Sequence, residues 1–156
     1  MANVFPCLWF KSEAEEALRY YVSIIKNSSL ESVNRVGDVQ PLPKSSVISA
    51  TAILDGERVL AINGNPQFPF TMAMSMVLLC DTQKDIDTYW DKLSAGGQTI
   101  QCGWLTDKYG VAWQVVPRIF PELLKGDQAS VDRMMTAMMT MTKLDIAALQ
   151  KAYDGQ

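Results

Sequence analysis

The side chains that most often carry out chemistry in proteins are sparse in this chain. Its 156 residues contain no histidine, which removes the commonest general base and the commonest metal ligand. Neither a Ser-His-Asp nor a Cys-His arrangement can therefore be assembled. The cysteines, Cys7, Cys80 and Cys102, are odd in number and form no Cys-x-x-Cys pair. They predict neither a disulfide framework nor a zinc ribbon, and we expect buried free thiols.

Other arrangements that could support catalysis are also weak. The paired acids Glu15/Glu16 and Asp85/Asp87 fall on helix faces that we expect to be exposed to solvent, so they are not predicted to work as an acid and a base. No basic residue closely precedes Cys102 to activate its thiol. A methyltransferase that uses S-adenosylmethionine typically has a glycine-rich loop after its first strand, but residues 11–14 here read Lys-Ser-Glu-Ala. No cofactor is predicted.

Composition excludes several functional classes. The formal net charge is −3 and no basic run occurs, so we expect no nucleic-acid partner. The apolar runs fall far short of the roughly 20 residues that a membrane span needs, and the N-terminus lacks the pattern of a signal peptide. With 48% hydrophobic residues, the chain is long and apolar enough for one folded domain. We expect a cytoplasmic protein without a membrane partner.

Hydrophobic periodicity predicts the order strand, helix and three strands, twice in succession. The first helix is expected to begin with a capping box, Ser12 with Glu15. The second is expected to begin at Asp81 or Thr82 and to end at Gly96-Gly97. The predicted strands are 4–10, 30–36, 46–54, 59–62, 73–80, 98–101, 102–106 and 111–116, with a loop at 37–44. Two tandem βαβββ modules with curved mixed sheets give an α+β fold.

The C-terminal segment reads differently from the rest. Residues 121–125 predict a helical turn, and residues 130–154 predict one long helix that ends before Gly155. Five of the nine methionines fall in this predicted helix, on a broad apolar surface. We expect this surface to pack against its own domain or against the same helix of a second subunit, because methionine is adaptable packing material.

Residues 101–117 predict a tight hairpin that closes the second module. Asp107 to Gly110 forms the turn, and we expect the Asp107 side chain to cap it. Alternation along the following strand places Trp113 on one face, which we assign to helix packing. Gln114 points to the other face and is a polar amide on an otherwise apolar strand.

The spacing Asp107-x-x-Gly110-x-x-x-Gln114 resembles the closing hairpin of the vicinal oxygen chelate superfamily, which includes glyoxalase I, extradiol dioxygenases and bleomycin-resistance proteins. The longer run 102–117 resembles the PhnB-like branch, whose members are often labelled 3-demethylubiquinone-9 3-methyltransferase. The resemblance covers the whole chain. It implies a single domain over 1–156, with a first βαβββ module at 1–66, a second at 70–117 and a C-terminal helical extension at 118–156.

In metal-dependent members of the superfamily, four side chains from four strands, usually His, Glu or Gln, meet at the metal. The resemblance places these positions at Cys7, Ala61 (or Asn63), Ser75 and Gln114. Such a set would bind a catalytic divalent ion poorly, so no metal is predicted. A pocket for a flat or aromatic ligand remains as the expectation. The expected ligand-facing residues are Cys7, Trp9, Asn63, Ser75, Trp104 and Gln114. The alternative is that they are interior residues that bond only to their neighbours.

Three functions follow as hypotheses. The leading one is a metal-independent small-molecule-binding protein of the vicinal oxygen chelate type that forms a homodimer. The second is an enzyme of the same fold that acts through a metal held largely by substrate oxygens. The third is a protein-interaction module that uses the methionine-rich helix. The ligand's identity does not follow from the fold.

Overall fold

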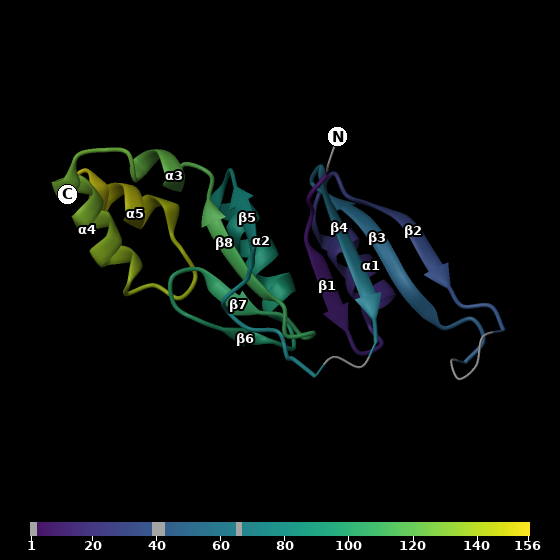
Figure 1. The fold of residues 1–156 in the computed structure, drawn as a ribbon. Helices are drawn as coiled ribbons and strands as arrows, with labels where there is room; N and C mark the ends of the chain where they lie inside the picture. Colours follow the sequence, from purple (N-terminus) through teal and green to yellow (C-terminus); the bar gives the residue numbers. More distant parts are fainter. Residues whose placement is uncertain (1–2, 39–42, 65–66) are drawn as a thin grey trace. The chain divides into compact units, whose positions relative to one another are not determined.

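The computed structural model describes residues 3–38, 43–64 and 67–156 (Figure 1). The chain divides into two compact units, Met1–Pro69 and Phe70–Gln156. The middle of the predicted loop at 37–44 and the predicted end of the first module, residues 65–66, lie outside the described residues. Within the described part, no helix is long and apolar enough to cross a membrane.

The first unit has a four-stranded sheet with one helix packed on it. The strand order is β1-β4-β3-β2, in which β1 is parallel to β4 and the other pairs are antiparallel. Apolar residues at helical spacing on α1, such as Leu18 and Tyr21, are completely buried against this sheet. The elements are β1 (Cys7–Phe10), α1 (Ala14–Ile24), β2 (Ser29–Arg35), β3 (Val47–Leu54) and β4 (Glu57–Asn63).

The second unit repeats this plan. Its strand order is β5-β8-β7-β6, again with one parallel pair, β5 with β8. The helix α2 buries Ile86, Tyr89, Trp90 and Leu93. Trp113 of β8 is buried and lies on the helix side of the sheet, as its alternation predicts. The elements are β5 (Met76–Cys80), α2 (Gln83–Ser94), β6 (Gln98–Thr99), β7 (Trp104–Thr106) and β8 (Ala112–Pro117).

The start of α1 differs from the predicted capping box. The residue before the helix is Glu13, which makes no side-chain cap, and Glu15 instead pairs with Arg19 and Arg35. The free N–H of Ala14 donates to Asn63 Oδ1 at 2.9 Å. The box fails because a residue from β4 caps this helix, a contact that local sequence cannot indicate.

The start of α2 is the predicted one. Thr82 has an extended backbone, and its Oγ1 accepts a hydrogen bond from the Asp85 N–H at 3.1 Å. This is the usual geometry of a threonine N-cap. The helix ends at Ser94, and Gly96 follows with φ of +77°, a conformation that glycine adopts without strain.

The predicted long C-terminal helix is wrong. The chain forms a short α3 (Phe120–Leu123), where a helical turn is predicted, and then two helices, α4 (Gln128–Met138) and α5 (Ile146–Tyr153), which pack together (Figure 1). The break has a specific cause. The carbonyls of Met141 and Thr142 accept hydrogen bonds from the N–H groups of Cys102 and Gly103 at 2.8 and 2.9 Å, and Asp145 then caps α5.

The methionine-rich surface packs on its own unit. Met134, Leu144 and Leu149 are buried together with Val116 of β8. Other residues are partly buried against this cluster. They include Leu79, Met135, Met138 and Met141. Met134 is completely buried, so it offers nothing to a partner protein, whereas Met139 is 64% exposed.

Candidate functional site

Each sheet has one face covered by its own helix and a second face, which we call the open face. Side chains alternate along a strand, and residues paired in register share a face. In β1, Leu8 and Phe10 are buried while Cys7 and Trp9 are exposed. In β8, Trp113 and Val115 are the helix-side residues. The open faces are therefore those that carry Cys7 and Trp9 in the first unit and Gln114 in the second.

The open face of the second unit brings three predicted site residues together. Gln114 of β8 is in register with Val77 on one side and with Trp104 on the other. Gln114 Nε2 donates a hydrogen bond to Ser75 Oγ at 2.9 Å. Val77, on the edge strand β5, is 55% exposed, while Trp104, Ser75 and Gln114 are half-buried.

The Ser75–Gln114 pair retains hydrogen-bonding capacity. Their mutual hydrogen bond uses an amide hydrogen of Gln114 and a lone pair of Ser75 Oγ, so the amide oxygen and the hydroxyl hydrogen are not engaged in it. An amide oxygen accepts and a hydroxyl donates, so the pair can bind a polar group on a small molecule. Both side chains are neutral, so the pair offers hydrogen-bonding groups and no charge.

The turn of the hairpin fixes the orientation of Gln114. Asp107 is only 2% exposed, and its carboxylate accepts hydrogen bonds from Tyr109 N, Val111 N and Trp113 Nε1 at 2.9, 3.1 and 2.9 Å. This confirms the predicted capping role of Asp107. Because Trp113 is anchored on the helix side, its neighbour Gln114 must point to the open face.

The open face of the first unit is apolar on β1 and β4 and polar on β3 and β2, where Asn34 Nδ2 donates a hydrogen bond to Ser49 Oγ at 3.0 Å. Trp9 is 46% exposed, and its register partner is Ile62. Cys7 pairs in register with Leu60. The Trp9 indole lies close over Gly64, where an added Cβ would come within 2.5 Å of Nε1. A side chain at position 64 would displace the ring, so glycine there fits the position of Trp9.

The cysteines differ in environment. Cys80 is buried as predicted, Cys102 is half-buried, and Cys7 is exposed, which contradicts the expectation of burial. Desolvation nevertheless raises the pKa of the Cys7 thiol. The thiol therefore stays protonated at neutral pH and is a poor nucleophile and a poor metal ligand in this state.

Asn63 and Ala61 do not share a face with Cys7 and Trp9. Ala61 is in register with the buried Leu8, and Asn63 with the buried Phe10. The Asn63 amide caps α1 at Ala14 N and donates to Val47 O at 3.1 Å. For Asn63, the alternative of an interior residue bonded to its neighbours describes what the structure shows. The capping role was not foreseen, because 49 residues separate the two partners.

The donor set implied for a metal does not fit a divalent ion. Ala61 offers no donor and lies on the helix side, and the adjacent open-face residues of β4, Leu60 and Ile62, are apolar. Ser75 and Gln114 are neutral, weak donors. Among the described residues there is also no group of three His, Cys, Asp or Glu side chains placed to hold a metal.

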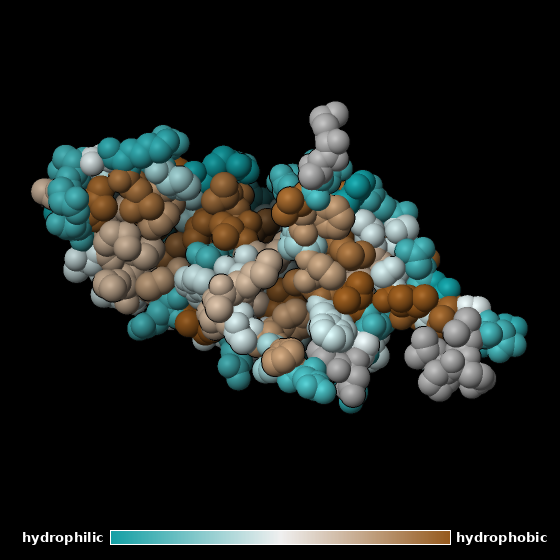
Figure 2. All heavy atoms as spheres, in the orientation of Figure 1, coloured by the Kyte–Doolittle hydropathy of each residue, from teal (hydrophilic) through white to brown (hydrophobic). Residues whose placement is uncertain are grey.

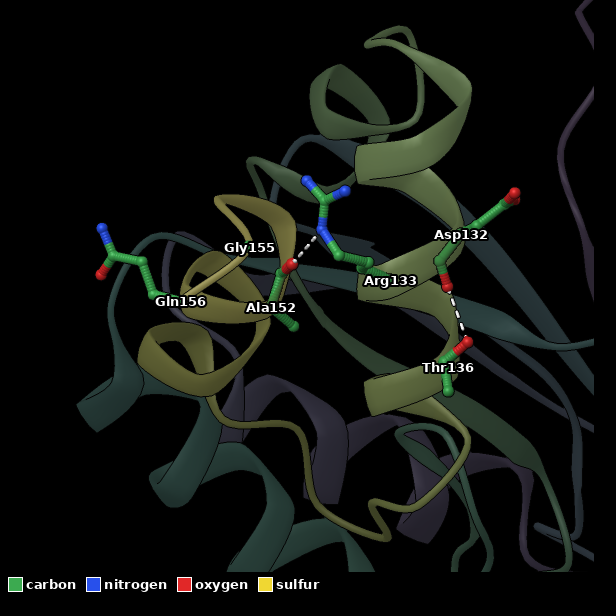
Figure 3. Close-up of a pocket in the computed structure, with 6 residues that line it drawn as sticks. All are labelled: Asp132, Arg133, Thr136, Ala152, Gly155 and Gln156. Atoms are coloured by element: carbon green, nitrogen blue, oxygen red, sulfur yellow. Dashed lines mark hydrogen bonds between the residues drawn. The ribbon is translucent and has the colours of Figure 1, made fainter.

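A separate shallow cavity of about 470 Å³ lies between α4 and the end of α5 (Figure 3). Its one cation, Arg133, donates to the carbonyls of Ala152 and Tyr153 at 3.1 and 2.7 Å and to Ser130 Oγ. Arg133 therefore satisfies the end of α5, where a basic group is favourable. The residues that line the cavity are Asp132, Arg133, Thr136, Ala152, Gly155 and Gln156.

Comparison with known proteins identifies the family of this chain and solved structures with a similar fold. The family described as 3-demethylubiquinone-9 3-methyltransferase matches residues 2–116. A PhnB protein from Bacillus cereus is 34% identical, with a TM-score of 0.69 over 74% of this chain and 98% of that one. A Pseudomonas aeruginosa protein is 23% identical, with a TM-score of 0.62 over 75% and 97%. No curated protein matches the chain.

A more distant similarity shows the fold alone. The fosfomycin resistance protein FosX from Listeria monocytogenes, solved with Mn(II) and sulfate, is 12% identical, with a TM-score of 0.54 over 80% of this chain and 95% of that one. The repeated strand order, the family match and the similarity to the Bacillus cereus protein agree. The chain belongs to the PhnB-like 3-demethylubiquinone-9 3-methyltransferase family, within the vicinal oxygen chelate superfamily and its glyoxalase/bleomycin resistance fold.

Proposed function

We propose that this protein binds a flat, largely apolar small molecule that carries a hydroxyl or carbonyl oxygen, without a metal, on the open face of its second unit. The observation that carries the proposal is the Ser75–Gln114 pair beside Trp104. The pair offers a donor and an acceptor to the ligand's oxygen. The indole and Val77 offer apolar surface to its ring, as binding sites with few polar groups commonly do.

The methyl transfer in the family's description finds no support in these residues. The stretch between β1 and α1, residues 11–13, contains no glycine, whereas a dinucleotide-like cofactor site needs a close backbone approach there. The neutral donor set argues in the same way against a metal-assisted reaction. Binding is the function that requires only the groups that are present.

The test is a nuclear magnetic resonance titration of ¹⁵N-labelled protein with two matched probes, 2-naphthol and naphthalene. We expect 2-naphthol to shift the indole N–H signal of Trp104 and the side-chain amide signals of Gln114. The buried indoles of Trp90 and Trp113 serve as internal controls. Naphthalene lacks the oxygen and should bind about 2- to 10-fold more weakly, which is the value of one hydrogen bond. Gln114→Leu should abolish that difference.

Two outcomes would overturn the proposal. One is the absence of any shift at Trp104 with either probe. The other is equal affinity for the two probes, because the Ser75–Gln114 pair would then recognise nothing.

We propose in addition that the protein is a homodimer, since apolar side chains such as Trp9 and Val77 are half exposed on the open faces. Figure 2 shows apolar residues at the surface over the strands of the second sheet as well as over the C-terminal helices. Native mass spectrometry of gently purified protein reads the subunit count, a retained organic ligand and any metal together. A monomer would contradict the dimer, and one metal per subunit would contradict metal-independent binding.

A further inference from the structure

The open face of the second unit is covered along part of its length. Two residues beyond the pair Val77 and Gln114, the next pair on the same face is Leu79 and Val116. Val77 is 55% exposed, but Val116 is only 8% exposed. Val116 is buried with Met134, Leu144 and Leu149, and Leu79 packs against them. The face thus passes from open to covered within one step along the strands, roughly 7 Å.

The covering segment is the C-terminal hairpin, defined as α4, α5 and the link 139–145. Met138 and Met141 of this segment pack against the cluster that covers Val116. Cys102, in the turn that precedes β7, donates its N–H to Met141 O at 2.8 Å, and its Sγ lies 3.7 Å from Met138 O. Both methionines are only partly buried, so their side chains retain surface that a ligand can touch.

The C-terminal hairpin is fixed in place rather than poised to move. Gln83 of α2 donates to Leu144 O at 3.0 Å and accepts from Ile146 N at 2.9 Å. Asp87 pairs with Lys143 at 2.8 Å. Gly103 and Leu144 are in close contact, because an added Cβ at position 103 would lie 3.0 Å from the Leu144 side chain. The segment is therefore a rigid wall.

We infer that this wall ends the ligand site and that Met138 and Met141 determine the size of the apolar group that fits beside Gln114. The inference rests on the proposed binding to this face. The site would accept compact aromatic hydroxyl compounds and disfavour those with a long alkyl substituent. The family match ends at residue 116, so the wall is built from residues outside the part that matches the family.

The test uses a series of probes, phenol, 4-ethylphenol, 4-butylphenol and 4-hexylphenol, titrated into the full-length protein and followed at the Trp104 indole signal. For the wild type we expect affinity to stop rising beyond the ethyl member. Met138→Ala and Met141→Ala, alone and combined, should raise affinity for the butyl and hexyl members at least several-fold and leave phenol unchanged. Met138→Leu conserves volume and should behave like the wild type.

Met139→Ala is the matched control, because Met139 belongs to the same methionine run but is 64% exposed. It should leave the whole series unchanged, and a melting curve of each variant shows whether it is folded. If the alanine variants bind every member of the series as the wild type does, Met138 and Met141 do not limit the size of the ligand, and the binding proposal stands. If the wild type binds no member, both the wall and the binding proposal are overturned.

Discussion

The two sheets place their strands in the same order, β1-β4-β3-β2 and β5-β8-β7-β6, but their open faces differ. The first carries Cys7, Trp9, Leu60 and Ile62 on β1 and β4, and a hydrogen-bonded polar pair, Asn34 and Ser49, on β2 and β3. The second has its hydrogen-bonded polar pair, Ser75 and Gln114, at β5 and β8, and the C-terminal hairpin over one end. In the first unit the polar pair therefore lies away from the parallel strands, whereas in the second it lies at them and is bounded by the C-terminal hairpin, because outward-facing positions can change without disturbing the helix-side core.

The turn aspartates of the two units, Asp107 and Asp55, differ in how much they contribute to the stability of the fold. Asp107 is buried and accepts hydrogen bonds from Tyr109 N, Val111 N and Trp113 Nε1, whereas Asp55 lies in the exposed β3–β4 turn with φ of +48°. Asp107→Asn should destabilise the protein by about 2–3 kcal/mol, because an amide NH₂ would replace one charged acceptor among these donors. Asp55→Asn should change stability by about 0.5 kcal/mol or less, since asparagine tolerates positive φ. Urea unfolding of both variants measures this, and equal losses would contradict the difference.

The two sheet-packed helices differ in the origin of their caps. Asn63→Ala should cost about 2 kcal/mol, because it removes a part-buried acceptor for Ala14 N and a donor to Val47 O. Thr82→Ala should cost about 1 kcal/mol, the usual value of a local cap. The unfolding midpoints in urea test the order. Asn63→Asp keeps the acceptor at the helix start and should fall between wild type and alanine; a loss as large as that of alanine would refute the capping role.

The C-terminal hairpin is attached to the second unit through the side chain of Gln83 in α2. Gln83→Ala removes both bonds to residues 144 and 146 and should cost about 1–2 kcal/mol. Hydrogen exchange should accelerate across 141–149 while the amides of α1 remain unchanged. Gln83→Glu retains an acceptor for Ile146 N but sets a carboxylate oxygen against Leu144 O and against Asp87 Oδ1, which lies 3.2 Å from the present amide nitrogen, so we expect an acceleration at least as large. A uniform acceleration throughout the chain would mean that Gln83 stabilises the whole fold.

Removal of a surface ion pair should give the smallest change in the free energy of unfolding. Hydrogen bonds from Arg19, then Arg35, hold the pKa of Glu15 below its usual range. A lowered folded-state pKa adds stability above the unfolded value, roughly 4.3, that is lost as the pH falls through the folded value. Glu15→Gln should therefore cost about 0.5 kcal/mol or less at neutral pH and nothing at low pH. Denaturant unfolding from pH 7 to about pH 3 measures this; a cost that grows toward low pH would contradict it.

In the second unit, Asp87 offers the matching test of an ion pair. Bonds from Lys143 and then Gln83 hold the pKa of Asp87 below its usual range, so the same sign applies. Asp87→Asn should lose stability at neutral pH and little at low pH, and added salt should reduce the difference. An effect insensitive to salt would indicate that the hydrogen bonds matter more than the charges.

Local signals in the sequence determined much of this molecule. Alternation placed Trp113 and Gln114 on opposite faces, the Asp107–Gly110 spacing predicted the capped turn, and Thr82 marked the start of α2. These features depend on residues within a few positions of one another, and their side-chain direction follows from strand or helix period. The order of strands and helices in both modules is of the same kind. Asp145 before an apolar run was also a readable start signal for α5, although the periodicity around it favoured one long helix.

Only the tertiary structure decided the rest. Asn63 caps α1 from 49 residues away, and the amides of Cys102 and Gly103 end α4 by binding carbonyls 39 residues further on. The burial of Val116 under the C-terminal hairpin likewise depends on residues distant in sequence. In each case the chain satisfies a backbone group or an apolar surface with whatever partner the fold brings near. A sequence pattern indicates that a backbone group or an apolar side chain requires a partner. Which residue is that partner depends on the tertiary packing.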